Sequence, residues 1–108
     1  MTDLPEAIVR PTRYAVSCVP ADAAPDAHVW AITIEEQRDG SWIAAHHGSW
    51  LTAEGDWEIG YSGSYAACSH GFDTALRLAK EAAPKVVING RTVEQALALA
   101  AEWKRNES

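Results

Sequence analysis

The dipeptide Asp39-Gly40 constrains the fold more than any other feature, because it separates two runs of β-forming residues. These runs cover residues 29–38 and 41–47. A two-residue type I′ turn needs positive φ at both central positions, and Asp-Gly tolerates this conformation. The sequence therefore predicts a β-hairpin that turns at Asp39-Gly40.

The register of this hairpin decides which side chains share a face. With Asp39 and Gly40 as the whole turn, Arg38 lies opposite Ser41. Counting outward, one face meets the helices, and it carries Trp30, Ile32, Ile34, Ile43, Ala45 and His47. The opposite face meets solvent, and it carries Thr33, Glu35, Gln37, Trp42, Ala44 and His46. A slip of one residue in the pairing would exchange the two faces.

Further β segments flank this hairpin. Alternating apolar and polar residues predict a strand over 13–19. After a bulge expected at Gly48, residues 49–53 and 57–61 lie on either side of a polar turn and predict one more hairpin. Residues 60–65, rich in Gly and Ser between aromatic residues, predict a flexible loop or the frayed end of the last strand.

A first helix is predicted from Phe72, where the apolar period changes to that of an α-helix. Asp73 near its start is expected to pair with Arg77 one turn later, and Pro84 ends the helix. Its apolar stripe comprises Phe72, Ala75, Leu76, Ala79, Ala82 and Ala83.

A second helix is predicted after a short β segment at 85–88 and a turn at Asn89-Gly90. The sequence from Thr92 to Gln95 is a capping box. In such a box the Thr92 side chain accepts a hydrogen bond from the Gln95 amide, and the Gln95 side chain accepts one from the Thr92 amide. The expected buried stripe comprises Val93, Ala96, Leu97, Ala100 and Trp103.

The order of these segments favours an α+β fold, because runs of strands are followed by helices. We predict an antiparallel sheet of four to five strands, built from hairpins, with two C-terminal α-helices packed on one face. Residues 1–12, with two prolines and little periodicity, form an N-terminal arm or tail. Residues 13–108 form a single domain.

Length and charge limit the classes of function. The chain has 108 residues, and its composition, 47% hydrophobic and 22% charged, is that of a globular domain. The net charge of −6 is concentrated in residues 20–66, which hold eight acidic side chains and one basic. Binding to nucleic-acid phosphates needs clustered Lys and Arg. The charge argues against direct nucleic-acid binding and favours a protein partner with a basic patch, or a cation.

The cysteines and the apolar segments indicate a cytoplasmic protein without a membrane partner. Cys18 and Cys68 are too few for a disulfide framework, so we expect two reduced, mostly buried thiols. The N-terminus lacks a basic region followed by an apolar one, and no run approaches the roughly 20 apolar residues of a membrane helix.

A metal site is the sharpest chemical hypothesis, because imidazole and thiolate are ligands that zinc prefers. Structural zinc sites usually show Cys-x₂-Cys or His-x₃-His, and this chain has neither spacing. His46 and His47 are neighbours on a predicted strand, so their side chains point to opposite faces and cannot readily bind one ion. We predict no cofactor and retain the candidate metal ligands for an alternative hypothesis: His46, Cys68 and His70, with His47, Cys18 and His28 as further members.

Catalytic motifs are not found in the sequence. The segment from Gly60 to Ser64 lacks the second glycine of a Gly-x-Ser-x-Gly nucleophile turn, and no phosphate-binding loop is present. Glu35 and Glu36 would point to opposite sides of a strand. We therefore predict no catalytic residues and a protein that is not an enzyme.

The tryptophans suggest where a partner binds. In the predicted register Trp30, Trp57 and Trp103 face the core, whereas Trp42 and Trp50 are exposed. Exposed tryptophan beside a polar rim is the residue type most enriched at binding hot spots. The predicted partner-binding residues are Trp42, His46, Glu35, Gln37 and Trp50. An exposed strand edge would in addition allow a homodimer formed by sheet extension.

Three segments, 13–20, 28–34 and 72–80, resemble uncharacterised small proteins of actinobacteria and their phages. The resemblance implies a cytoplasmic accessory protein, phage-encoded, that modulates a host protein, and it transfers no site residues. The leading hypothesis is thus a non-enzymatic protein-binding module that acts through an acidic sheet face bearing Trp and His. The alternative is a small-ligand or zinc-binding protein, or an enzyme, with a site near residues 61–70.

Overall fold

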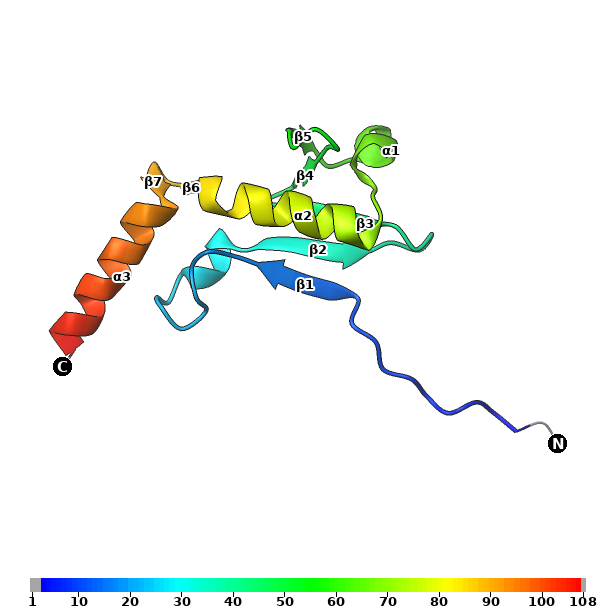
Figure 1. Cartoon of the computed structure of the whole chain (residues 1–108), viewed down its shortest axis with the longest axis horizontal. Helices are drawn as coiled ribbons and strands as arrows, with labels where there is room; N and C mark the ends of the chain where they lie inside the picture. Colours follow the sequence, from blue (N-terminus) through cyan, green and yellow to red (C-terminus); the bar gives the residue numbers. More distant parts are fainter. Residues whose placement is uncertain (1–2, 108) are drawn as a thin grey trace.

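A five-stranded antiparallel sheet in chain order, β1-β2-β3-β4-β5, forms the centre of the computed structural model, which describes residues 3–107. A two-stranded sheet and three α-helices complete it, so the predicted α+β class is confirmed (Figure 1). The strands of the main sheet are β1 Arg13–Val16, β2 Ile32–Glu36, β3 Trp42–His46, β4 Ser49–Leu51 and β5 Trp57–Ile59.

The remaining elements connect or cover the sheet. The 3₁₀ helix η1 follows β1, and η2 leads into the short helix α1 after β5. The long helix α2 is extended by η3, and the small sheet of β6 and β7 precedes the C-terminal helix α3. Their bounds are η1 Ala27–Trp30, η2 Ser62–Ser64, α1 Tyr65–Cys68, α2 Phe72–Ala82, η3 Ala83–Lys85, β6 Val87–Ile88, β7 Arg91–Thr92 and α3 Val93–Glu107.

The turn between β2 and β3 is one residue longer than predicted. The amide of Gly40 donates to the carbonyl of Gln37 at 3.0 Å, and the amide of Gln37 donates to the carbonyl of Ser41 at 2.7 Å. Gly40 has φ 84°, whereas Asp39 keeps a negative φ. This geometry is a type I turn followed by a left-handed glycine, which makes a three-residue loop. The predicted two-residue turn at Asp39-Gly40 is therefore wrong.

Asp39 stabilises this loop through its carboxylate. It accepts hydrogen bonds from the Ser41 hydroxyl at 2.6 Å, the Ser41 amide at 2.9 Å and the Tyr65 hydroxyl at 2.9 Å. These bonds, with the Ser41 hydroxyl contributing most, lower the pKa of Asp39 below its ordinary value. The loop thus depends on an ionised Asp39.

The pKa of Asp39 predicts a stability difference that depends on pH. Because the pKa is lower in the folded state, the contribution of Asp39 is complete above the unfolded value of about 3.9 and is lost as the pH falls through the folded value. We expect the Asp39→Asn variant to melt below wild type at neutral pH, and the gap to narrow below about pH 4. Thermal unfolding followed by circular dichroism across this range measures the gap. A gap independent of pH would contradict this account.

A type I′ turn does occur in the sheet, but one hairpin later. His47 and Gly48 have φ 48° and 82°, and His46 pairs with Ser49 across the turn. Positive φ at both central positions is what a type I′ turn requires. Gly48 is thus a turn residue and not the predicted bulge, and β3 and β4 are closed by a two-residue connection.

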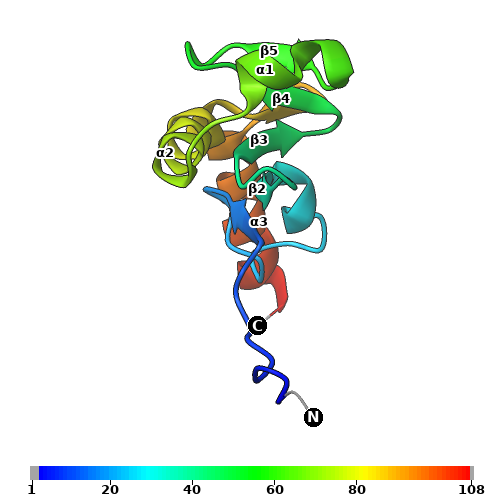
Figure 2. The ribbon, with the colours of Figure 1, turned by 90° about the vertical axis from the view of Figure 1, so that its right-hand side faces the viewer.

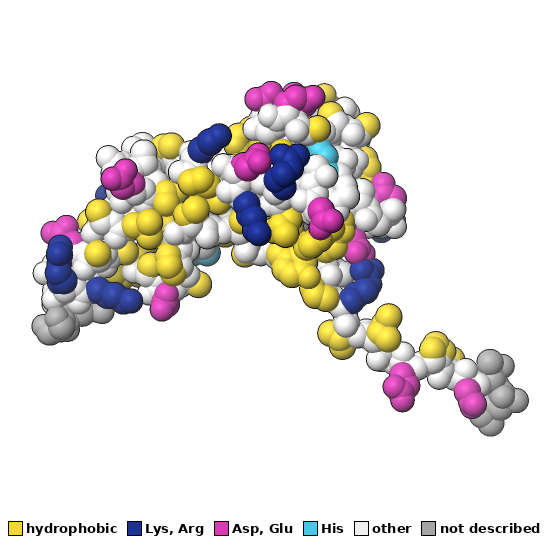
Figure 3. Space-filling view, in the orientation of Figure 1, with side chains coloured by type: hydrophobic (Ala, Val, Ile, Leu, Met, Phe, Trp, Pro, Cys, Tyr) yellow, Lys and Arg dark blue, Asp and Glu magenta, His cyan; other side chains and the backbone are white. Residues whose placement is uncertain are grey.

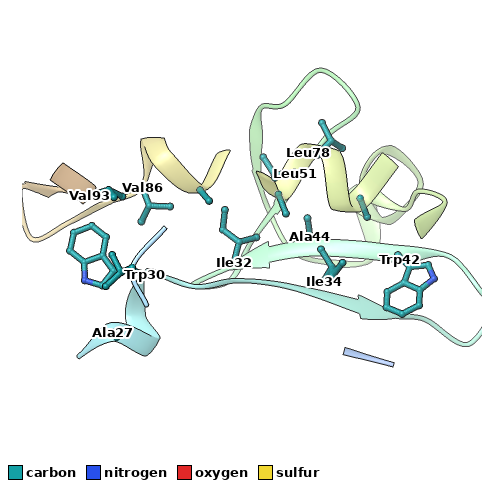
Figure 4. Packing of buried hydrophobic residues seen from close by; sticks show 14 of the residues in the cluster. Ala27, Trp30, Ile32, Ile34, Trp42, Ala44, Leu51, Leu78, Val86 and Val93 are labelled. Carbon is teal, nitrogen blue, oxygen red and sulfur yellow. The ribbon is translucent and has the colours of Figure 1, made fainter. Parts of the chain in front are cut away.

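The longer first turn shifts β3 by one residue against β2. Ile34 pairs with Ala44 and Glu35 pairs with Ile43, instead of the predicted Ile34 with Ala45. Because side chains alternate along a strand, the shift exchanges the faces of β3. Trp42 and Ala44 consequently share the inner face with Ile32 and Ile34, as Figure 4 shows. Ile43 and Ala45 lie on the outer face, which corrects the predicted register.

Helix α2 covers this inner face (Figure 2). Its buried side chains Ala75, Leu78 and Ala79 pack in one hydrophobic cluster with Ile32 and Ile34. The helix occupies the span predicted from the apolar stripe. The expected pairing of Asp73 with Arg77 is wrong, because the guanidinium of Arg77 lies 3.3 Å from the Glu81 carboxylate at the next turn. The amphipathic pattern alone was sufficient to predict this helix.

Helix α3 begins as predicted but does not lie across the sheet. The amide of Thr92 donates to the Gln95 side chain at 2.9 Å, and the amide of Gln95 donates to the Thr92 hydroxyl at 3.2 Å, so the capping box is confirmed. Val93 and Ala96 join the core cluster. The C-terminal part of α3 then extends beyond the end of the sheet (Figure 1).

The N-terminal arm leaves the opposite end of the molecule (Figure 1). Residues 3–12 have no regular secondary structure, and residues 1–2 of the predicted arm lie outside the described residues. The arm is fastened where the guanidinium of Arg10 makes two hydrogen bonds of 2.6 Å to the Glu36 carboxylate, which lowers the pKa of Glu36. The projecting arm and α3 raise the radius of gyration to 17.2 Å, against about 13 Å for a compact domain of this size.

Candidate functional site

The predicted partner surface is divided between the two faces of the sheet. Trp42 is only 8% exposed, and its ring contacts Phe72 of α2 edge to face with centroids 4.9 Å apart. Tyr14 of β1 completes this aromatic group. His46 lies on the same inner face as Trp42. The expectation that Trp42 is exposed is therefore wrong, because the one-residue shift places it beneath α2.

His46 is half-buried and has a structural partner. Its Nε2 lies 2.8 Å from the carbonyl oxygen of Val29, and since a carbonyl only accepts, Nε2 carries the proton. Its ring stacks on that of His47 with centroids 4.0 Å apart. Both rings border an open hollow of 370 Å³ that Trp57 and Lys85 also line. The predicted inward position of His47 is wrong, since His47 is an exposed turn residue.

Glu35, Gln37 and Trp50 remain together on the outer face of the sheet. They line a shallow hollow of 200 Å³ with Thr33, Ile43 and Ala45. The Gln37 side chain donates to the Glu35 carbonyl at 3.0 Å. The indole of Trp50 lies so close to Gly60 that a Cβ there would be 2.5 Å from the ring. Gly60 thus allows the half-buried indole of Trp50 to pack directly against the backbone.

The candidate metal ligands do not form a metal site. Within residues 3–107, no three side chains of His, Cys, Asp or Glu are placed to hold a metal ion. The Nε2 of His70 lies 2.9 Å from the Leu51 carbonyl oxygen. Cys68 is fully buried, and this burial raises the pKa of its thiol, so the thiol stays protonated at neutral pH. Cys18, expected to be mostly buried, is exposed, and His28 is exposed as well.

Most of the segment 60–70 is helical, although the glycines and serines of residues 60–65 predicted a flexible loop or the frayed end of the last strand. It forms η2 and α1. The buried Ser64 hydroxyl donates to the Ile59 carbonyl at 2.8 Å, and the Tyr61 carbonyl oxygen lies 3.0 Å from the same hydroxyl. The hydroxyl of Tyr65 bonds to the β2–β3 loop through Asp39. This segment acts as a structural link between β5 and α2.

Two further tryptophans are exposed where the sequence predicted core positions. Trp57 is 41% exposed on the short strand β5. Trp103 is 46% exposed near the end of α3. Trp30 is buried as expected, although in η1 and not in a strand. Exposed tryptophan therefore occurs at places other than those predicted, and Trp103 borders a hollow beside α3.

This hollow is a groove of about 480 Å³ between α3 and the segment 19–30. Two tryptophans, the buried Trp30 and the exposed Trp103, contribute to its apolar lining. Figure 3 shows hydrophobic side chains gathered on this part of the surface. We call it the α3 groove, and its apolar lining consists of Val19, Ala24, Pro25, Trp30, Ala96, Leu99, Ala100 and Trp103.

The charges around the α3 groove are mixed, with an acidic excess. Asp26 and Glu102 lie on its border, with Arg91 and Asn106 as the other polar residues. All four side chains are exposed. The groove thus offers an apolar floor with a polar rim that holds two carboxylates and one guanidinium, and an apolar centre with a polar rim is typical of binding sites.

The α3 groove was not predicted, because residues 21–27 read as an exposed loop and Trp103 as a core residue. One signal was present. Residues 96–101 read Ala-Leu-Ala-Leu-Ala-Ala, which is apolar on every side of a helix, and Leu99 lies outside the predicted buried stripe. Such a helix has more apolar surface than one sheet face covers.

Among residues 3–107, none of the helices has the length and apolar character needed to cross a bilayer. No protein-family model, curated protein or solved structure matches this chain.

Proposed function

We propose that this protein is a non-enzymatic protein-binding module and that its binding site is the α3 groove. The observation that supports this most is the size and lining of the groove: about 480 Å³ of open space bordered by two tryptophans and several aliphatic side chains. A pocket of this size with a mainly apolar lining is the default candidate for a binding site. Tryptophan at such a site is the residue type most enriched at hot spots.

The charges define the partner as a segment with apolar side chains next to Lys or Arg. The rim carboxylates of Asp26 and Glu102 favour a positive charge beside the groove, and the whole chain carries a net charge of −6. Electrostatic complementarity of this kind increases association rates and specificity. An amphipathic helix with a basic edge fits this description, since helices dock their apolar faces into grooves.

The outer sheet face is a second surface for the same function. It keeps Glu35, Gln37 and Trp50 together, but its hollow has less than half the volume of the α3 groove. The prediction that this protein is phage-encoded and modulates a host protein is compatible with a peptide-binding groove.

The test is a selection of binding peptides followed by a matched pair of variants. A displayed library of random peptides, selected on the wild-type protein, should yield sequences with two or three apolar residues flanked by Lys or Arg. We expect Trp103→Ala to weaken a selected peptide about 30-fold, the loss typical of a hot-spot tryptophan. Fluorescence anisotropy of the labelled peptide measures the affinity.

Trp57→Ala is the matched control, because Trp57 and Trp103 are exposed to nearly the same extent, 41% and 46%. It should bind the selected peptide as wild type does. Loss of affinity in Trp50→Ala, with Trp103→Ala unchanged, would move the site to the outer sheet face. A selection without an apolar-basic consensus would contradict the proposal.

A further inference from the structure

Helix α3 carries an exposed apolar face on the side away from the α3 groove. Its buried residues Val93, Ala96 and Ala100 face the body of the protein. Leu97 is 38% exposed, and Ala101 is exposed as well. Neither of them lines the groove. Residues 96–101 of α3 are all apolar. A helical segment that is apolar on every side is normally buried on every side, so a second surface is expected to cover this face.

The exposed face is a regular stripe. Glu94, Leu97, Ala101 and Lys104 follow one another at spacings of three, four and three residues, which places them on one side of an α-helix. All four side chains are exposed. Glu94 and Lys104 make no ion pair with another side chain in the part of the chain that the structure describes. This helix face therefore has an acidic end, an apolar centre and a basic end.

The stripe is complementary to itself when reversed. Leu97 and Ala101 lie two residues on either side of position 99, and Glu94 and Lys104 lie five residues on either side of it. In an antiparallel pair centred there, Leu97 meets Ala101 of a second copy, and Glu94 meets Lys104 of that copy. A two-fold axis makes each contact occur twice.

We propose that this protein forms a homodimer in which α3 packs antiparallel against α3 of a second copy. A large side chain beside a small one lets the two helices approach closely and interdigitate. The antiparallel arrangement sets opposite charges together and opposes the two helix dipoles. A parallel arrangement would instead place Glu94 beside Glu94 and Lys104 beside Lys104. The order of charges therefore selects a second copy of this chain, in one orientation.

The dimer leaves the α3 groove free, because the two features occupy different sides of the helix. The residues of α3 that line the groove, among them Leu99 and Trp103, are absent from the stripe. Dimerisation can thus fail while peptide binding succeeds, and the reverse holds too. The dimer also differs from one made by sheet extension, which would use the edge strands β1 or β5.

Charge reversal tests the dimer. Sedimentation equilibrium of the wild-type protein, from micromolar to millimolar concentration, should show a species of twice the chain mass of 11.7 kDa. Glu94→Lys and Lys104→Glu each turn both attractive pairs into repulsive ones, so each should raise the dissociation constant about tenfold. The double variant E94K/K104E should return to the wild-type value.

Mixing the two single variants provides the internal control. In the antiparallel heterodimer both pairs are again opposite in charge, so a one-to-one mixture should dimerise as strongly as wild type. Leu97→Asp should be monomeric, with a circular dichroism spectrum that shows an intact fold. The proposal would be overturned if the wild-type protein remained monomeric, or if the dissociation constant of the dimer were the same in the charge-reversal variants as in wild type.

Discussion

Ala44→Lys is expected to unfold most of the protein, whereas Ala45→Lys leaves it folded. Ala44 has no exposed surface and faces α2. A lysine there adds a long side chain to a filled core and buries a charge that has no partner, each of which costs several kcal/mol. We expect a loss of more than about 4 kcal/mol, a large part of the total stability of a domain of this size.

Ala45 is the control for the same strand and the same substitution. It lies on the outer face, half-buried, with its side chain toward solvent and Glu35 as a diagonal neighbour. The added ammonium group stays hydrated and meets an acidic surface, so the change in unfolding free energy should stay within about 1 kcal/mol. Urea unfolding of both variants measures the difference. The opposite order of stabilities would favour the two-residue turn at Asp39-Gly40.

Trp42→Ala is expected to lower the unfolding free energy by about 3 kcal/mol or more. Trp42 is 8% exposed and contacts both Phe72 and Tyr14. Removing the indole leaves a cavity between the sheet and α2 that the rigid strand cannot close. Chemical denaturation and the thermal midpoint both report this loss.

Trp57→Ala distinguishes this effect from the general cost of removing a tryptophan. Trp57 is 41% exposed, and its nearest aromatic neighbour is His46, with ring centroids 6.0 Å apart. Its removal should cost about 1 kcal/mol or less, since much of the ring already contacts water. Equal losses for the two variants would mean that Trp42 contributes no more to the core than a surface tryptophan does.

The elements that depend on local interactions were predicted from the sequence. The span of α2 follows from one apolar stripe that ends near Pro84, and the start of α3 follows from the capping box of Thr92 and Gln95. Asn89 and Gly90, with φ 50° and 78°, form the predicted turn. In each case the interacting groups are at most a few residues apart, so the neighbouring sequence contains the whole signal.

The sequence did not place the candidate site residues correctly, because it is compatible with two different turns at Asp39-Gly40. Asp-Gly fits a two-residue turn, and it fits equally well the last two positions of a type I turn followed by a left-handed glycine. The choice is made by Asp39, which bonds to Ser41 and, 26 residues away, to Tyr65. That choice shifts β3 by one residue and decides whether Trp42 or Ile43 meets α2.

The sequence by itself determined the α+β class, the extent of α2 and the capped start of α3, because helix periodicity and capping act within one or two turns of the chain. Only the tertiary structure decided which face of β3 is buried, that Trp103 borders an open groove, and that one side of α3 lacks a cover. These properties depend on contacts between residues far apart in the chain, and a one-residue difference in a single turn reverses the faces of a strand.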